Sequence, residues 1–219
     1  MTVLLWLLKN SKTEIKIVLA TLTVLIFLPI VSVVVVASSG IQLVGDALAS
    51  LNPVTQLIEI FDTEGNVIGE VELTTNWPTR GYVSDEFGTH LPFRQAMGLG
   101  AHTGIDIANE YGYYGEPVTP FMTGKVLYTD QIDDSACGIN IKLQHEYNIT
   151  STYCHLSSVI NIPLETVVNP GDVIGYMGST GASTGSHLHL TTSIYGIPIN
   201  PRTFLVGEPE RSSVVIPTF

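Results

Sequence analysis

The longest apolar run in the chain lies near its N-terminus, where residues 17–37 read IVLATLTVLIFLPIVSVVVVA without a charged side chain. At ~1.5 Å of rise per residue, this run spans about 31 Å as a helix, which is close to the hydrocarbon thickness of a bilayer. A buried core helix of this length would show a polar face, whereas only Thr21, Thr23 and Ser32 interrupt this one. The pattern therefore predicts a single transmembrane helix over residues 17–37.

The basic residues around this run predict its orientation. Lys9, Lys12 and Lys16 precede the run, and the next basic residue after it is Arg80. Because positively charged flanks stay on the cytoplasmic side of a membrane, we expect residues 1–16 in the cytoplasm. The rest of the chain then lies on the outer or periplasmic side of the cell membrane.

A cleaved signal peptide is the alternative interpretation of the same run. The segment Val35-Val36-Ala37 resembles a small-residue cleavage site. The run is, however, longer than the apolar region of about 7 to 15 residues that is usual in signal peptides. The length favours a retained anchor, and either interpretation predicts that the remainder of the chain is exported.

Beyond residue 40 the hydrophobic pattern changes to short segments of period two. Leu57–Phe61 and Val67–Leu73 alternate around the turn residues 62–66, which predicts a hairpin, and a short helix is expected before them over Gln42–Leu51. Frequent Gly and Pro residues divide the remainder into short strands, expected at Pro117–Val118, Gly124–Tyr128, Ile139–His145, Ser151–Leu156, Val173–Met177 and His187–Ile194. This spacing predicts a mainly β fold, a compact antiparallel β-sandwich or half-barrel.

The same patterns predict how the chain is divided. We expect a cytoplasmic N-terminus, a transmembrane helix, a linker that contains the hairpin, one main β domain and a C-terminal tail, over residues 1–16, 17–37, 38–80, 81–205 and 206–219 respectively.

Composition narrows the possible functions. The 219 residues contain 9 Lys and Arg against 20 Asp and Glu, a formal net charge of −11, which argues against binding nucleic acid through its phosphates. The two cysteines, Cys137 and Cys154, form no Cys-x-x-Cys pair, so a structural zinc knuckle is not expected. Two free buried thiols and one disulfide both remain open, and a disulfide would suit an exported domain.

Six histidines carry the candidate chemistry. In His187-Leu188-His189 the two imidazoles point to the same face if the segment is a strand. His102 and Asp106 add an imidazole and a carboxylate at a fixed spacing, and His155 lies in an expected strand. A His from each region together with Asp106 would give three metal ligands and an open fourth position, which is the plan of catalytic zinc sites. Of the others, His145 is expected to be structural at a hairpin turn, and His90 to lie on a surface loop.

Taken together, these motifs resemble the lysostaphin-like, LytM-type zinc endopeptidases of the M23 peptidase family. The resemblance runs from about Ser84 to Pro201 and rests on an ordered set of motifs: His102-x-x-x-Asp106, Tyr153-Cys154-His155-Leu156, Gly171-Asp172-Val173-Ile174-Gly175, Gly178-Ser179-Thr180-Gly181, Ser183-Thr184-Gly185-Ser186-His187-Leu188-His189 and Asn200-Pro201. Leu190-Thr191, Cys154 and the loop Asp133–Cys137 depart from the family pattern, which bears on substrate preference more than on catalysis.

The resemblance implies a compact antiparallel β-structure with a groove that holds one Zn²⁺ per chain. It implies His102, Asp106 and His189 as zinc ligands, and His155 and His187 as catalytic histidines. A neutral imidazole can accept the proton of the attacking water, and a second can stabilise the oxyanion. We assign His155 as the general base and His187 as the stabiliser, although the sequence does not fix which is which.

The expected function is a membrane-anchored zinc metalloendopeptidase, a hydrolase that cuts cross-links or stem peptides of bacterial peptidoglycan in the cell wall. The alternative is a non-hydrolytic scaffold, or a partner-activated component of an envelope machine for secretion, conjugation or phage functions. A scaffold would be expected to lack a ligand, and none of the five positions is missing. A further hypothesis is that residues 57–80 block the groove in a resting state.

Overall fold

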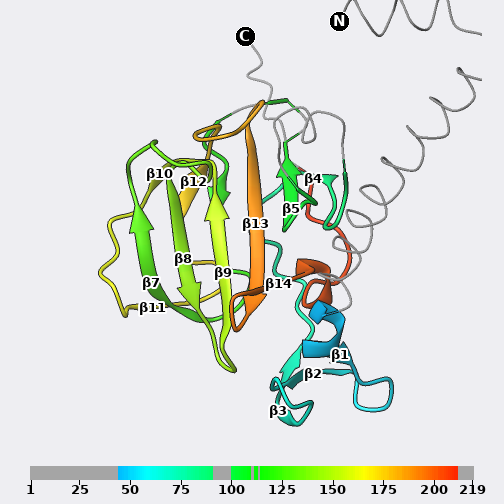
Figure 1. Cartoon of the computed structure of the whole chain (residues 1–219). Coiled ribbons are helices and arrows are strands. Elements are labelled where there is room, and N and C mark those ends of the chain that lie inside the picture. Colours follow the sequence, from blue (N-terminus) through cyan, green and yellow to red (C-terminus); the bar gives the residue numbers. More distant parts are fainter. Residues whose placement is uncertain (1–43, 91–99, 110, 113, 212–219) are drawn as a thin grey trace, which may run out of the picture. The chain divides into compact units, whose positions relative to one another are not determined.

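The computed structural model of the protein describes residues 44–90, 100–109, 111–112 and 114–211 (Figure 1). Within these ranges, helical structure is confined to residues 44–48 and the 3₁₀ turn η1 (Pro201–Thr203). The strands are β1 (Ala49–Leu51), β2 (Leu57–Phe61), β3 (Val67–Glu72), β4 (Tyr82–Asp85), β5 (Ile105–Ala108), β6 (Pro117–Val118), β7 (Gly124–Asp130), β8 (Asn140–Gln144), β9 (Ile149–Cys154), β10 (Leu156–Val159), β11 (Val167–Val168), β12 (Gly175–Met177), β13 (His187–Ile194) and β14 (Ile197–Ile199).

The strands form three sheets, and every pairing between named strands is antiparallel. The largest sheet has the order β11-β7-β8-β9-β13-β5-β4, and β14 pairs with β13 beside this path. A second sheet, β10-β12-β6, is entered directly from β9, and a third consists of β1-β2-β3. Figure 1 shows β7, β8, β9 and β13 side by side, with β5 and β4 beyond β13. The prediction of a mainly antiparallel β fold is confirmed.

Strand β13 shows how the hydrophobic pattern positions the site. Along its eight residues half-buried and buried positions alternate, with Leu188 and Leu190 fully buried in the core. Burial of these apolar side chains stabilises the sheet and fixes its register, because a shift by one residue would expose them. His187 and His189 therefore point to the opposite face, as predicted from their spacing.

Two local predictions are wrong. The strand expected over Ser151–Leu156 is interrupted at His155, where the chain leaves β9 with a φ of 63° and enters β10 in another sheet. The helix expected to reach Leu51 ends at residue 48, because Ala49–Leu51 pair with β2 as β1. The hairpin signal is confirmed by the pairing of β2 with β3.

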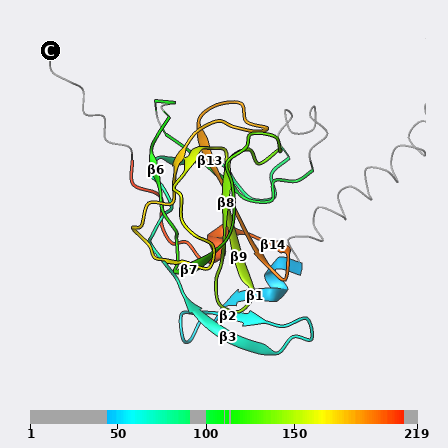
Figure 2. The ribbon, with the colours of Figure 1, turned by 90° about the vertical axis from the view of Figure 1, so that its left-hand side faces the viewer.

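The region predicted as a linker contributes to the core. Leu48, Ala49, Ile58 and Ile60 are buried in the same hydrophobic cluster as β13, and the described residues between 44 and 211 belong to one compact unit. The β1–β3 sheet lies near β14, at the C-terminal end of β13 (Figure 2). Among the residues described, no helix is long and apolar enough to cross a membrane. The predicted transmembrane helix over residues 17–37 lies outside them, as does the cytoplasmic segment 1–16.

Candidate functional site

An open groove of about 730 Å³ lies over one face of the large sheet. Its lining includes Asp106, His155, His187 and His189, together with both cysteines. None of the described residues from 44 to 80 lines this groove, so the structure gives no support to the hypothesis that residues 57–80 block it. His90, which was expected on the surface, is exposed and lies outside the lining.

Strand register brings two of the predicted ligands together. On β13, His189 is directly opposite Asp106 of β5, and on its other side it is opposite Cys154 of β9. His102 reaches the same place from the turn before β5. This turn passes so close to β13 that a Cβ on Gly104 would lie 2.2 Å from the carbonyl oxygen of Leu190. Glycine at this position of the His-Thr-Gly-Ile-Asp motif is therefore a steric requirement.

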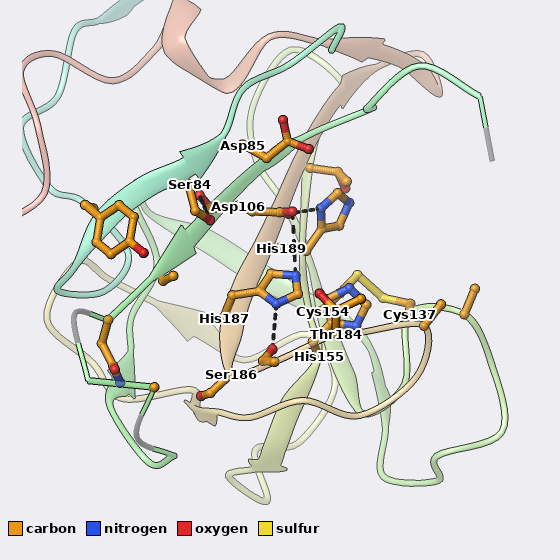
Figure 3. Close-up of a pocket in the computed structure, with 18 of the residues that line it drawn as sticks. Ser84, Asp85, Asp106, Cys137, Cys154, His155, Thr184, Ser186, His187 and His189 are labelled. Carbon is orange, nitrogen blue, oxygen red and sulfur yellow. Dashed lines mark hydrogen bonds and ion pairs between the residues drawn. A yellow bond between two sulfur atoms is a disulfide. The ribbon is translucent and has the colours of Figure 1, made fainter. Parts of the chain in front are cut away.

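Three ligand atoms converge at this point, and Figure 3 shows two of the residues, Asp106 and His189, side by side. Nδ1 of His189 lies 2.7 Å from Oδ1 of Asp106 and 2.9 Å from Nε2 of His102, and the last two atoms are 3.1 Å apart. Nδ1 of His102 donates to the carbonyl oxygen of Glu86 at 2.9 Å, which leaves its Nε2 with a lone pair. Electron-rich atoms packed this closely repel each other unless a proton or a cation lies between them, so His102, Asp106 and His189 could hold a metal ion.

The electrostatics of the ligands suit metal binding, which requires an ionised carboxylate and neutral imidazoles. Burial alone would raise the pKa of Asp106, but its hydrogen bonds with His102 and His189 hold that pKa well below its ordinary range. Burial lowers the pKa of His189 and outweighs the opposing effect of Asp106.

Sequence analysis did not identify Asp85, a second carboxylate behind the first ligand. Oδ2 of Asp85 lies 3.3 Å from Nδ1 of His102, and it is buried without a hydrogen-bond partner in the described structure. An unpaired buried carboxylate oxygen is costly, and a cation on His102 would compensate its charge. Only the structure identifies this residue, because Asp85 is on β4 and reaches His102 through the pairing of β4 with β5.

Two further histidines stand beside the three ligands. The ring centroids of His155 and His187 are 4.8 Å apart, and those of His155 and His189 are 5.7 Å apart. Nδ1 of His155 donates to the carbonyl oxygen of Thr180 at 2.7 Å, and Nδ1 of His187 donates to that of Gly185 at 2.8 Å. Nε2 of His187 lies 3.7 Å from Oδ2 of Asp106. All five predicted site residues are therefore gathered at one place.

The environment of His155 keeps its imidazole neutral. Burial, together with the nearby His187 and His189, lowers the pKa of His155 to about 4 against the smaller opposing effects of the Thr180 hydrogen bond and of Asp106. With Nδ1 protonated, Nε2 carries the lone pair and has no hydrogen-bond partner among the described residues. Such a nitrogen is available to take a proton from a water molecule in the groove.

The two cysteines form a disulfide at the edge of the groove, so the disulfide alternative is confirmed (Figure 3). Cys154 occupies the strand position just before His155, and Cys137 belongs to the loop that departs from the family pattern. The expected structural role of His145 is also confirmed. It lies at the β8–β9 turn, where Nδ1 donates to the carbonyl oxygen of Thr123 and Nε2 accepts from Ser151.

Fold and site together define a class of protein, an antiparallel β-protein with two histidines and one aspartate as candidate ligands in an open groove. Residues 100–201 match Peptidase family M23. This segment, a little under half of the chain, is therefore an M23 peptidase domain.

The chain is similar to curated proteins of this kind. It is 36% identical over 129 residues to a DD-carboxypeptidase/endopeptidase Mpg of Neisseria meningitidis, a match that covers 58% of this chain and 28% of that protein. It is 32% identical over 113 residues to the peptidoglycan DD-endopeptidase ShyA of Vibrio cholerae, over 52% of this chain and 24% of that protein. The match thus spans about a quarter of the length of these relatives.

The solved structures support the fold. A zinc-containing peptidase from Vibrio cholerae superposes with a TM-score of 0.50 at 23% identity, over 74% of this chain and 47% of that chain. At this identity the likeness extends to the fold alone.

Proposed function

We propose that the protein is a zinc-dependent endopeptidase that hydrolyses peptide bonds of bacterial peptidoglycan, in cross-links or stem peptides. The observation that carries this proposal is the convergence of His102, Asp106 and His189 beside a neutral histidine in an open groove. Three protein ligands with an open side are the plan of catalytic zinc sites, whereas structural zinc sites are closed by four.

The donor set fits zinc. Two imidazole nitrogens and one carboxylate oxygen are common zinc ligands, and a set that lacks thiolate is also usual for catalytic sites. The unpaired Oδ2 of Asp85 behind His102 is the second-sphere carboxylate that such sites use to orient a ligating imidazole. When bound here, zinc would activate a water molecule and polarise the scissile carbonyl.

The chain's own residues would supply the proton transfers. His155 accepts the proton of the attacking water through Nε2, because its Nδ1 is already occupied by Thr180. His187 reaches the groove from β13, with its ring centroid 4.8 Å from that of His155, and an N–H at its Nε2 would donate to the developing oxyanion. Once protonated, His155 can donate this proton to the nitrogen of the leaving amine while the C–N bond breaks, which returns its imidazole to the neutral form.

Peptidoglycan as the substrate is supported by the relatives rather than by the groove. The Vibrio cholerae relative is named as a peptidoglycan DD-endopeptidase, and the Neisseria meningitidis relative as a DD-carboxypeptidase/endopeptidase. An open groove suits a peptide that is part of a polymer, because the chain can enter and leave from the side.

Membrane anchoring is part of the proposal. The apolar run over residues 17–37 and the three lysines before it support a single-pass anchor with a cytoplasmic N-terminus. The disulfide suits an extracytoplasmic peptidase domain, because disulfides persist in oxidising compartments.

The test is digestion of purified peptidoglycan by the full chain in detergent, with and without a chelator. We expect zinc-dependent release of peptide fragments, whose masses identify the bond that is cut. His102→Ala should abolish release, whereas His90→Ala, which alters an exposed histidine outside the groove, should leave it unchanged. A chain that binds zinc but releases nothing would support the scaffold alternative.

A further inference from the structure

The bend that carries His155 needs support from its surroundings. His155 lies between β9 of the large sheet and β10 of a second sheet, with a φ of 63°. Non-glycine residues adopt this left-handed conformation when neighbouring contacts impose it. The groups that hold the bend therefore decide where the imidazole points.

One set of contacts comes from the loop before β8. The backbone N–H of His155 donates to the carbonyl oxygen of Cys137 at 2.9 Å, and that of Leu156 donates to Ile139 at 3.0 Å. The disulfide between Cys137 and Cys154 joins the same two segments covalently. The backbone on both sides of His155 is thus fastened to residues 137–139.

Thr180 contributes the second set of contacts. Its carbonyl oxygen accepts the Nδ1 proton of His155 at 2.7 Å. Its hydroxyl accepts the backbone N–H of Ile139 at 3.0 Å and donates to the carbonyl oxygen of Leu156 at 2.7 Å. One residue therefore touches the imidazole, the bend behind it and the loop that is disulfide-bonded to the bend.

The two loops are in direct backbone contact, which keeps Thr180 in place. Gly138 and Gly181 both have positive φ, and a Cβ on either would lie 2.5 Å from backbone atoms of the other loop. The N–H of Ala182 donates to the carbonyl oxygen of Ala136 at 2.9 Å, and that of Gly181 to Oδ1 of Asp133 at 2.6 Å.

We propose that Thr180 is a positioning residue for His155, and that the Cys137–Cys154 disulfide maintains the support on which Thr180 acts. The carbonyl of Thr180 selects the tautomer protonated at Nδ1, so Nε2 is left to face the groove. The hydroxyl fixes that carbonyl relative to the bend. The inference rests on the proposed function, in which His155 accepts a proton.

The disulfide makes this arrangement sensitive to thiols. Reduction by a dithiol breaks the bond between the two sulfur atoms, transfers two electrons and two protons to them, and oxidises the reductant to its own disulfide. Residues 137–139 then remain attached to the bend only by hydrogen bonds. We expect a lower kcat in the reduced protein, because the imidazole of His155 is then less well placed.

The experiment compares Thr180→Val with Thr180→Ser in the full chain. Valine keeps the shape but leaves Ile139 N–H and Leu156 C=O without the hydroxyl, whereas serine retains it. We expect Thr180→Val to lower kcat about 10- to 100-fold with KM unchanged, and Thr180→Ser to restore most of the rate. Thr129→Val on β7, away from the groove, is the matched control.

A second readout does not depend on activity. The ¹⁵N shifts of the His155 ring report which nitrogen carries the proton, and we expect the Nδ1–H form in the wild type and a mixture of forms in Thr180→Val. Reduced wild type should shift toward the mixture and recover on reoxidation. If Thr180→Val does not fold, the reduced wild type compared with the oxidised wild type tests the same support of His155.

Wild-type kcat and ring shifts in Thr180→Val or in the reduced protein would overturn the proposal. An equal loss in Thr180→Ser would also overturn it, because the hydroxyl would then not be the cause. If the wild type cleaves no wall peptide, the proposed function fails, and the ring shifts still decide whether Thr180 sets the tautomer.

Discussion

His145 and His155, ten residues apart, are both buried histidines with a neutral imidazole, but they have different roles. Burial lowers the pKa of each to about 4. Each also donates from Nδ1 to a backbone carbonyl of another segment, at 2.8 Å to Thr123 and at 2.7 Å to Thr180. They differ at Nε2. In His145 this nitrogen accepts from the hydroxyl of Ser151 at 2.7 Å, whereas in His155, which lines the groove, it has no hydrogen-bond partner among the residues that the structure describes.

The comparison teaches that neutrality alone does not make a histidine catalytic. His145 is part of a buried polar network, in which both nitrogens of its ring have hydrogen-bond partners. Ser151, one of these partners, also contacts the hydroxyl of the buried Tyr153. In His155, Nδ1 has a hydrogen-bond partner and Nε2 has none within the described part of the chain, beside three candidate metal ligands. An unused lone pair in an open groove is what separates the site residue from the structural one.

The largest expected effect is on activity and comes from His155→Gln. Removal of the base should lower kcat by about 10²- to 10⁴-fold, because general-base catalysis contributes about that much. Zinc affinity should stay within a few-fold of the wild type, since His155 is not among the three ligands. Steady-state kinetics and equilibrium dialysis check the two parts, and a wild-type kcat would remove His155 from the mechanism.

The matching change at the other histidine, His145→Ala, should act on stability instead. It leaves Ser151 and the carbonyl of Thr123 without their partner in the core, which costs about 3 kcal/mol when the unsatisfied groups and the cavity are combined. Denaturant unfolding measures this loss. The folded variant should retain its kcat, and a loss of kcat as large as that of His155→Gln would break the distinction between the two histidines.

The pH dependence of stability gives a separate check on His145. Its pKa is depressed from 6.5 to about 4 on folding, so its contribution to stability is complete above pH 6.5 and is lost as the pH falls toward 4. The loss amounts to about 3 kcal/mol at ~1.4 kcal/mol per pH unit. Between pH 7 and 4, the free energy of unfolding should decrease less with falling pH in His145→Gln than in the wild type. An equal decrease in the two proteins would contradict a buried neutral His145.

The smallest expected effect is that of Asp85→Asn. Loss of the carboxylate behind His102 should weaken metal affinity by about 10- to 100-fold, as is usual for outer-shell partners of ligating histidines. Competition with a chromogenic chelator measures the affinity. Glu86→Gln is a suitable control, because its side chain pairs with Arg202 while only its backbone contacts His102.

The sequence predicted those parts of the site that depend on local patterns. Alternation on β13 placed His187 and His189 on one face, and strand register then brought Asp106 opposite His189. The resemblance to a known family supplied the roles of His102 and His155, which the residue pattern alone had given only as candidates. In the same way, the hairpin over β2 and β3 follows from alternation around a turn.

The parts that could not be predicted depend on contacts between distant segments. Asp85 approaches His102 only because β4 pairs with β5. The break at His155 is imposed by the loop of Cys137 and by Thr180, which are 18 and 25 residues away in sequence. Local periodicity cannot distinguish a continuous strand from one that changes sheets at a left-handed residue.

The most direct test of the proposed peptidase site is a zinc titration of the metal-free full chain, with peptide release from purified peptidoglycan recorded in the same samples. We expect release to rise with added zinc and to stop rising at one zinc per chain, with neither tight binding nor release in His189→Ala. Release without zinc, or full release by His189→Ala, would contradict the assignment of His102, Asp106 and His189 as the catalytic metal site.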